Sequence, residues 1–189
     1  KMEFAARSMT EALSPTNLAI TNPEVIKRAV ETRGESLLKG LRHMLAALAR
    51  GQLSHVAPDA FEVGVSIATT PGKVIHETEL YQLIHYAPVT KQVFTVPLVI
   101  FPPWINRFYI LDLNPQKSFV KWAAEQGLSV FMVSWKSADA SMKDLVWDDY
   151  VEAQVDAIDT VRDLLGVPHV HAIGYCVAGT TLAATLAML

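Results

Sequence analysis

Hydrophobic side chains recur every three or four residues in the first quarter of the chain, a spacing typical of amphipathic helices. The stretch "TNPEV" marks the start of one helix, because Asn22 suits the N-cap and Pro23 and Glu24 suit the first turn. A later helix is expected to end near Arg50 and Gly51. The region 1–58 is therefore predicted to form a helical N-terminal domain.

That later helix carries an apolar stripe. The members of the stripe are Leu37, Leu38, Leu41, Met44, Leu45 and Leu48. We expect the stripe to pack against the rest of the chain, and a docking face for a partner is the alternative. Gly34 and Gly40 are candidate breaks in the helical segment, because glycine is a poor helix former.

The hydrophobic pattern changes after residue 58. Between residues 61 and 88, short and partly alternating segments are separated by proline and glycine, as in strands and turns. From Val96 onward, the apolar runs "VPLVIF", "LSVFMVSW" and "HVHAIG" alternate with helical patterns in "QKSFVKWAAEQ" and 147–165. Such alternation predicts an α/β domain at 59–189, with a parallel sheet covered on both faces.

Composition narrows the function classes. The 189 residues are 51% hydrophobic and 19% charged, which is typical of a globular protein with a sizeable core. A formal net charge of −3 without a run of Lys or Arg gives no electrostatic footprint for nucleic acid. No apolar stretch approaches the roughly 18 residues of a membrane span, so no transmembrane segment is expected. The single cysteine cannot form an internal disulfide, which favours a cytoplasmic location.

This cysteine stands in "GYCVAG", between the predicted strand "HVHAIG" and a helix. The arrangement is that of a nucleophile elbow, a strained turn that exposes one side chain at the C-terminal edge of a sheet. Gly174 and Ala178 meet the need for small residues beside Cys176, and Gly179 gives clearance between helix and strand. The backbone amide of Val177 is expected to stabilise an oxyanion. Simple burial of the thiol is the alternative, and the strand–turn–helix setting favours a nucleophile.

A second oxyanion donor is expected from the loop that begins "PPWIN". An amide of Trp104 or Ile105 is the candidate, and simple packing of the loop is the alternative. The carboxylates of "WDDY" lie in the first turn of a helix, where they are expected to serve capping. The six histidines show no metal-ligand spacing, so we expect no metal site, and His169 and His171 lie at the wrong end of the elbow strand to act as its base.

Several motifs follow one another through almost the whole chain. They are "SPTN" with "TNPE", "GESLLKGL", "FEVG", "PPWINRFYILDL", "VSW" with "DASM", "WDDY" and "GYCVAG". In these motifs the chain resembles the polyhydroxyalkanoate synthases, and its helical N-terminal segment favours class I. The resemblance implies an acyltransferase that polymerises (R)-3-hydroxyacyl-CoA through a cysteine-bound acyl thioester and releases CoA, with no cofactor because coenzyme A is part of the substrate. It also implies a homodimer that works at the surface of polymer granules in the cytoplasm.

The resemblance further implies an α/β-hydrolase fold that is truncated here after the nucleophile elbow. Ala178 replaces the second glycine of the family's usual G-x-C-x-G box, and alanine is expected to be tolerated. The family's aspartate and histidine follow the nucleophile, so we expect them beyond residue 189 and take the chain to be a fragment. Two alternatives remain: a cysteine-dependent thioesterase or esterase, and a noncatalytic fragment for dimerisation or granule binding.

Overall fold

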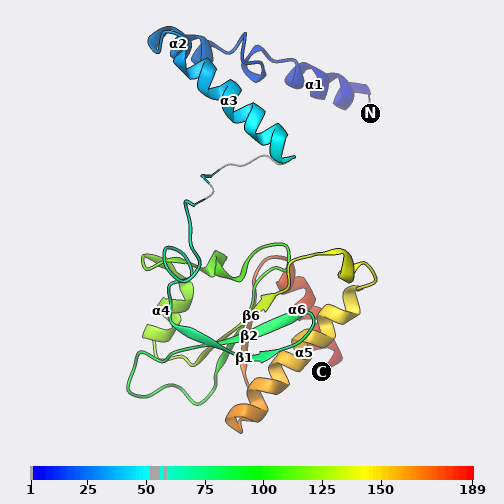
Figure 1. The fold of residues 1–189 in the computed structure, drawn as a ribbon. Coiled ribbons are helices and arrows are strands. Elements are labelled where there is room, and N and C mark those ends of the chain that lie inside the picture. Colours follow the sequence, from blue (N-terminus) through cyan, green and yellow to red (C-terminus); the bar gives the residue numbers. More distant parts are fainter. Residues whose placement is uncertain (1, 52–55, 58) are drawn as a thin grey trace. The chain divides into compact units, whose positions relative to one another are not determined.

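The computed structural model describes residues 2–51, 56, 57 and 59–189, and Figure 1 shows their fold. Two compact units make up the chain, Lys1–Pro58 and Asp59–Leu189. The first unit is helical and the second is built around a β-sheet, so the chain contains both of the expected structural types.

Local sequence signals set the helix ends in the first unit. Its elements are α1 (Met2–Ala12), a 3₁₀ turn (Pro15–Asn17), α2 (Pro23–Glu31) and α3 (Glu35–Arg50). Asn22 caps α2 as predicted, because its side-chain oxygen accepts from the amides of Glu24 at 2.9 Å and Val25 at 3.4 Å. Gly51 ends α3 in the left-handed conformation at φ 65°, which also confirms the prediction.

The two candidate breaks behave differently. Gly34 separates α2 from α3 at φ 85°, whereas Gly40 lies inside an uninterrupted α3, so the break expected at Gly40 is wrong. One glycine costs a helix only about 1 kcal/mol relative to alanine, and the surrounding leucines, lysine and arginine are good helix formers. The six side chains of the apolar stripe are 48–70% exposed. Their packing against the rest of the chain therefore stays a prediction.

A five-stranded sheet forms the centre of the second unit. Its strands are β1 (Gly72–Glu77), β2 (Tyr81–Tyr86), β3 (Leu98–Phe101), β6 (Val130–Trp135) and β7 (His171–Gly174), in the order β1-β2-β6-β3-β7. Strands β6, β3 and β7 are parallel, as predicted. Strands β1 and β2, whose direction the sequence pattern left open, are antiparallel to their neighbours, so the sheet as a whole is mixed. A three-residue turn joins β1 to β2, and a connection so short can only join antiparallel strands.

The remaining elements surround this sheet. They are α4 (Phe119–Glu125), α5 (Trp147–Leu165), α6 (Val177–Met188), the hairpin of β4 (Asp112–Asn114) with β5 (Lys117–Ser118), and two 3₁₀ turns (Phe108–Leu111 and Ala140–Met142). The predicted helices at 147–165 and after "GYCVAG" are confirmed. The region 61–70 forms no named strand and contains only an isolated bridge between Val63 and Ile67.

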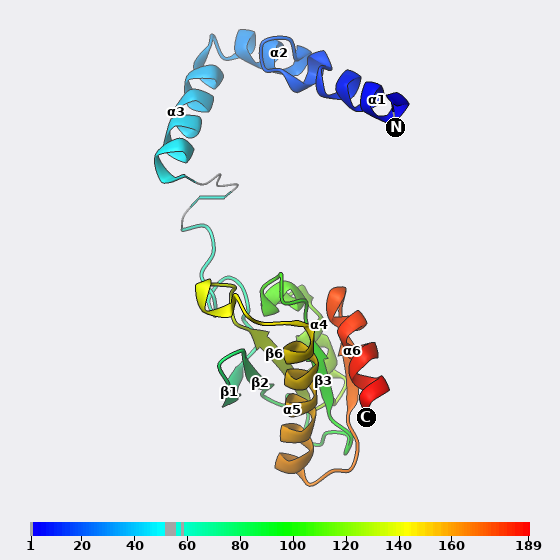
Figure 2. The same cartoon turned by 90° about the vertical axis from the view of Figure 1, so that its right-hand side faces the viewer.

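Hydrophobic cores cover both faces of the sheet, as predicted. In β3, Val99 and Phe101 pack in one core with residues of α5 and α6, and Leu98 and Ile100 pack in the other with residues of α4. All four side chains are buried. Figure 2 shows α5 and α6 beside the sheet. Each such side chain contributes about 1.5–3 kcal/mol by leaving water, so these buried strands hold the loops at their ends in place.

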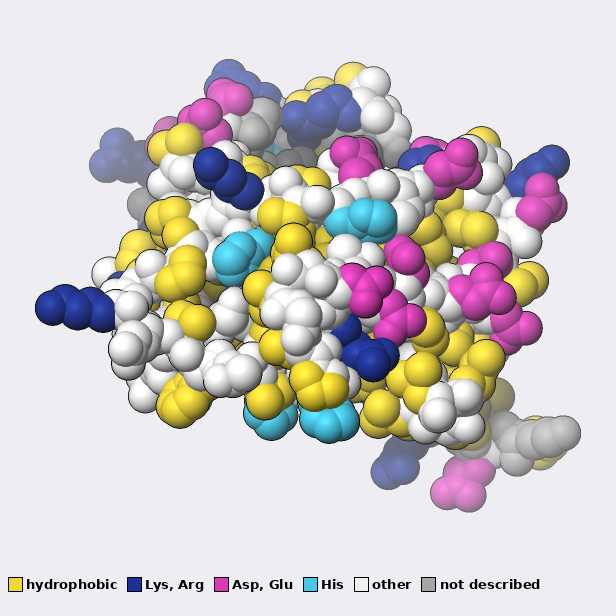
Figure 3. All heavy atoms as spheres, turned by 90° about the horizontal axis from the view of Figure 1, so that it is seen from below, with side chains coloured by type: hydrophobic (Ala, Val, Ile, Leu, Met, Phe, Trp, Pro, Cys, Tyr) yellow, Lys and Arg dark blue, Asp and Glu magenta, His cyan; other side chains and the backbone are white. Residues whose placement is uncertain are grey.

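One face of the second unit is drawn in Figure 3. Hydrophobic, acidic and neutral polar side chains mix on this face, and the Lys and Arg side chains stand apart from one another. This face therefore carries no continuous basic band.

Candidate active site

Cys176 lies on the turn between β7 and α6, where the sequence predicts it. The strand ends at Gly174, the helix begins at Val177, and the cysteine is exposed. Its backbone adopts φ 58° and ψ −128°, a region that residues other than glycine rarely occupy. Such a conformation costs on the order of 1–3 kcal/mol and persists only where the surroundings enforce it. The exposed thiol is thus held in a strained turn.

Close packing of the backbone enforces this conformation. A Cβ atom on Gly174 would lie 2.6 Å from the carbonyl oxygen of Ala178 and 2.6 Å from the Cα of Gly179. A Cβ atom on Gly179 would lie 2.9 Å from the carbonyl oxygen of Gly174. The amide of Tyr175 also donates to Phe101 at 3.0 Å, which ties the turn to the neighbouring strand β3. These distances bear out the need for a small residue at Gly174 and the clearance that Gly179 was expected to give between helix and strand.

The amide of Val177 is available at the first position of α6. The next two amides are used within the turn, since Ala178 donates to Tyr175 at 3.2 Å and Gly179 donates to Cys176 at 2.9 Å. Among the described residues, the Val177 amide has no acceptor. A free N–H group at a helix N-terminus attracts negative charge. The expected role of Val177 in binding an oxyanion stays a prediction.

The loop after β3 leaves the same edge of the sheet as the cysteine turn. Phe101 of β3 pairs in parallel with Gly174 of β7, so the residues that follow both strands emerge together. The amide of Asn106 donates to Pro103 at 3.1 Å and closes a tight turn with Trp104 and Ile105 at its centre. Within the described part of the chain, the amides of these two central residues donate to no acceptor.

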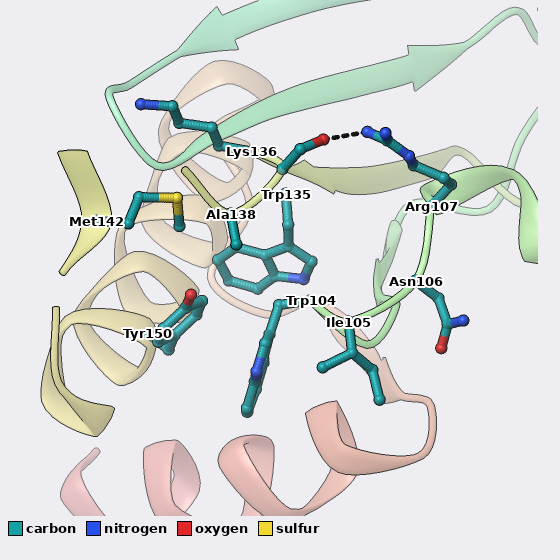
Figure 4. Close-up of a pocket in the computed structure, with 10 residues that line it drawn as sticks. Trp104, Ile105, Asn106, Arg107, Trp135, Lys136, Ala138, Met142 and Tyr150 are labelled. Atoms are coloured by element: carbon teal, nitrogen blue, oxygen red, sulfur yellow. Dashed lines mark hydrogen bonds between the residues drawn. The ribbon is translucent and has the colours of Figure 1, made fainter. Parts of the chain in front are cut away.

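A cavity of about 490 Å³ opens beside this loop. Figure 4 shows its walls, which come from Trp104–Arg107, Trp135–Ala138, Met142 and Tyr150. Trp104 and Ile105 line it, and Cys176 and Val177 do not. The predicted oxyanion donors therefore share one edge of the sheet, but only the residues of the β3 loop line this cavity.

A cluster of aromatic rings, which the sequence reasoning missed, forms one wall of the cavity. The ring centroid of Trp104 lies 4.6 Å from that of Tyr150, 5.6 Å from that of Trp147 and 6.4 Å from that of Trp135. Burial, and to a smaller degree the nearby Asp149 carboxylate, raises the pKa of Tyr150. The signal lay in "PPWIN" and "WDDY", whose aromatic residues meet only in the folded chain.

The carboxylate of Asp149 serves capping, as predicted, because it accepts from the amide of Val146 at 2.6 Å.

The cavity has two basic residues on its rim. Lys136 is paired with Asp139 at 3.3 Å, and hydrogen bonds from Ser141 lower the pKa of that carboxyl group. Arg107 donates to the hydroxyl of Ser137, and among the described residues it has no carboxylate partner. The rim therefore keeps one positive charge that is not paired.

Two of the expectations from the sequence concern metal binding and the histidines. No group of three or more His, Cys, Asp or Glu within them is placed to hold a metal ion. His171 begins β7 at the end opposite Cys176, as expected, and His55 lies outside the described residues.

None of the described helices is long and apolar enough to cross a membrane.

The fold and the exposed cysteine first define a class: an α/β protein with a candidate nucleophile at a strand-to-helix turn. The family model described as the N-terminus of poly-beta-hydroxybutyrate polymerase (PhaC) matches residues 1–123. The chain belongs to the poly(3-hydroxyalkanoate) polymerase family, as its motifs indicate.

Individual relatives agree with this assignment. The chain is 44% identical to the poly(3-hydroxyalkanoate) polymerase subunit PhaC of Cupriavidus necator, over 100% of this chain and 32% of the relative. It is 42% identical to the subunit of the same name from Rhizobium etli, over 100% of this chain and 30% of the relative. It is 36% identical to poly(3-hydroxyalkanoate) polymerase 1 of Ectopseudomonas oleovorans, over 96% of this chain and 33% of the relative. The chain thus spans about a third of the length of these curated relatives.

Proposed function

We propose that the complete gene product containing this chain polymerises (R)-3-hydroxyacyl-CoA into polyhydroxyalkanoate, with Cys176 as the nucleophile. Membership of the polymerase family supports the reaction class. The observation that carries the proposal for the residue is the strained, exposed conformation of Cys176 at the start of α6.

The proposed chemistry has two steps. In the first, the Cys176 thiolate attacks the thioester carbonyl, the bond to the CoA sulfur breaks, and CoA leaves as a thiol after taking up a proton. One thioester replaces another, so this exchange costs little energy. In the second, the 3-hydroxyl of a neighbouring acyl unit attacks the cysteine-bound acyl group, forms an oxoester and returns the thiol. The scheme needs no resident cofactor or metal, because coenzyme A arrives as part of the substrate.

Two kinds of group assist these steps in the proposal. The amides of Val177 and of Trp104 or Ile105 stabilise the oxyanion that forms on the attacked carbonyl. Their lack of other acceptors among the described residues supports this role. A histidine base and an aspartate, which the family resemblance assigns to positions after residue 189 in an α/β-hydrolase arrangement, deprotonate the thiol and the attacking hydroxyl.

We further propose that the protein acts as a homodimer at the surface of polymer granules in the cytoplasm. The exposed apolar stripe of α3 supports an attachment of this kind, because an uncovered hydrophobic face favours contact with another surface.

Substitution of the cysteine tests the proposed reaction. In the complete gene product, Cys176→Ala is expected to abolish both CoA release from 3-hydroxybutyryl-CoA and covalent labelling of the protein by a radiolabelled acyl group. Asp163→Ala, on the exposed end of α5, is the control and should keep both activities. Persistent labelling of Cys176→Ala would contradict the assignment of the nucleophile. Release of free 3-hydroxybutyrate instead of polymer by the unsubstituted protein would favour the thioesterase alternative.

A further inference from the structure

The indole of Trp135 makes a directed contact with the loop that carries the proposed oxyanion donors. Trp135 is the last residue of β6 and is only 7% exposed. Its indole N–H donates to the carbonyl oxygen of Pro102 at 2.7 Å, and this is a buried hydrogen bond. Pro102 and Pro103 are buried and, as prolines, have no backbone N–H group to donate. The carbonyl of Pro102 is therefore the backbone group through which β6 holds the start of the loop.

A second set of contacts restrains the centre of the same loop. The ring of Trp104 packs against Tyr150 and Trp147 of α5, at centroid distances of 4.6 and 5.6 Å. Trp135 contacts both Trp104, at 6.4 Å, and Tyr150, at 5.3 Å. Figure 4 shows the side chains of Trp104, Trp135 and Tyr150 converging on the cavity from separate elements. Trp135 therefore contacts the loop in two ways. Its indole N–H bonds to the backbone at Pro102, and its ring contacts the ring of Trp104 at the centre of the loop.

The far end of the loop is tied to the segment that directly follows β6. Arg107 donates to the hydroxyl of Ser137, two residues after Trp135. Between the tethers at Pro102 and Arg107 lie only four residues, and the bond between Asn106 and Pro103 closes them into a turn. The Trp104 and Ile105 amides thus lie in a short turn that is held at one end by Trp135 and at the other by Ser137.

We propose that Trp135 is a positioning residue for the oxyanion hole, acting through the hydrogen bond of its indole N–H to Pro102. This inference rests on the proposed function, since the loop amides matter only if a tetrahedral oxyanion forms there. An oxyanion donor works at about 2.7–3.1 Å from the developing charge. A displacement of about 1 Å can lower the rate of a reaction about 100-fold, so the anchor of the loop affects rate although Trp135 itself does not touch the substrate.

The test removes the N–H group and keeps the packing. Trp135 is replaced, in the complete gene product, by 3-benzothienylalanine, which has the shape of tryptophan with sulfur in place of the N–H, and in parallel by Trp135→Phe. The rate of acylation by 3-hydroxybutyryl-CoA is measured in single-turnover experiments as the release of CoA. Alkylation of Cys176 by iodoacetamide is measured on the same samples, because that reaction uses the thiol but creates no oxyanion.

We expect acylation to slow by about 10- to 100-fold in both variants, as when an oxyanion donor is misplaced. The alkylation rate and the substrate concentration at half-maximal rate should change by less than about twofold. Trp122→Phe is the matched control, because Trp122 lies on α4, is 52% exposed and contacts Phe119 instead of the loop. It should leave both reactions unchanged.

Three outcomes would overturn the inference. They are an unchanged acylation rate in the benzothienyl variant, an equal loss of acylation and alkylation, and an equal loss of acylation in Trp122→Phe. If Trp135→Phe does not fold, the benzothienyl variant decides alone, because it preserves the ring shape. Failure of the proposed function is recognised separately, since in that case the unsubstituted protein would itself not be acylated at Cys176.

Discussion

Helix α3 of the first unit and helix α5 of the second are of similar length, 16 and 19 residues, and both carry apolar side chains at helical spacing. Helix α3 buries one residue, Ala47, whereas α5 buries six. The six are Val151, Ala153, Gln154, Ala157, Ile158 and Val161. The difference lies in what each helix meets, because α5 packs in a core shared with the sheet and with α6. An apolar stripe therefore defines the face that a helix will bury, and not the surface that covers it.

Side-chain truncation should show this contrast most strongly. Ile158→Ala, at a side chain only 5% exposed, is expected to cost about 2–5 kcal/mol of unfolding free energy because it leaves a cavity in the core. Leu45→Ala in α3, at a side chain 54% exposed, should cost less than about 1 kcal/mol. Denaturant unfolding of the complete gene product gives both values. An equal loss in the two variants would contradict the comparison and would mean that another surface covers the α3 stripe in solution.

The same Gly→Ala substitution should have opposite signs in the two regions. At Gly174 the new Cβ meets backbone atoms of Ala178 and Gly179 at 2.6 Å, so a loss of about 1–3 kcal/mol is expected from overpacking. At Gly40 the Cβ meets no atom within 4 Å, and alanine should stabilise α3 by up to about 1 kcal/mol.

Thermal unfolding and the alkylation rate of Cys176 measure the two effects. Gly174→Ala should also change the reactivity of the thiol, because it disturbs the strained turn, and Gly40→Ala should not. Equal melting temperatures for the two variants would show that the turn can relax without cost.

The smallest expected effect concerns pH. The ring of His85 stacks on Phe131 in the second unit, with centroids 4.4 Å apart, and burial lowers the pKa of His85 below its ordinary value of 6.5. The unfolded state therefore binds the proton more tightly than the folded state. The stability from neutral His85 is present above pH 6.5 and is lost as the pH falls through the lowered folded-state pKa.

We expect the unfolding free energy of the unsubstituted protein to decrease below pH 6.5, and His85→Gln to reduce that slope. Urea unfolding at several pH values between 7 and about 5 checks this expectation. An unchanged slope in His85→Gln would mean that other groups cause the pH dependence.

The predictions that succeeded from sequence depend on contacts between near neighbours in the chain. The cap of Asn22, the end of α3 at Gly51 and the span of α5 are each decided within a few residues. The turn at Cys176 was also predictable, because Gly174 and Gly179, which must approach each other, are only five residues apart.

The predictions that failed or were missed depend on partners distant in sequence. The antiparallel pairing of β2 with β6 joins segments about fifty residues apart, and alternation of side chains alone does not state the direction of a strand. The hydrogen bond from Trp135 to Pro102 and the packing of Trp104 on Tyr150 likewise join residues of separate elements. The aromatic residues of "PPWIN" and "WDDY" are visible in the sequence, but no local pattern shows that they meet.

Local patterns in the chain were enough to place most helices, the buried strands, the family motifs and Cys176 on a tight strand-to-helix turn. The direction of β1 and β2, the loop amides without acceptors and the side chain that holds their loop became known only from the folded chain. Caps, turns and hydrophobic periodicity act over a few residues, whereas strand direction and loop anchoring depend on the packing of distant segments.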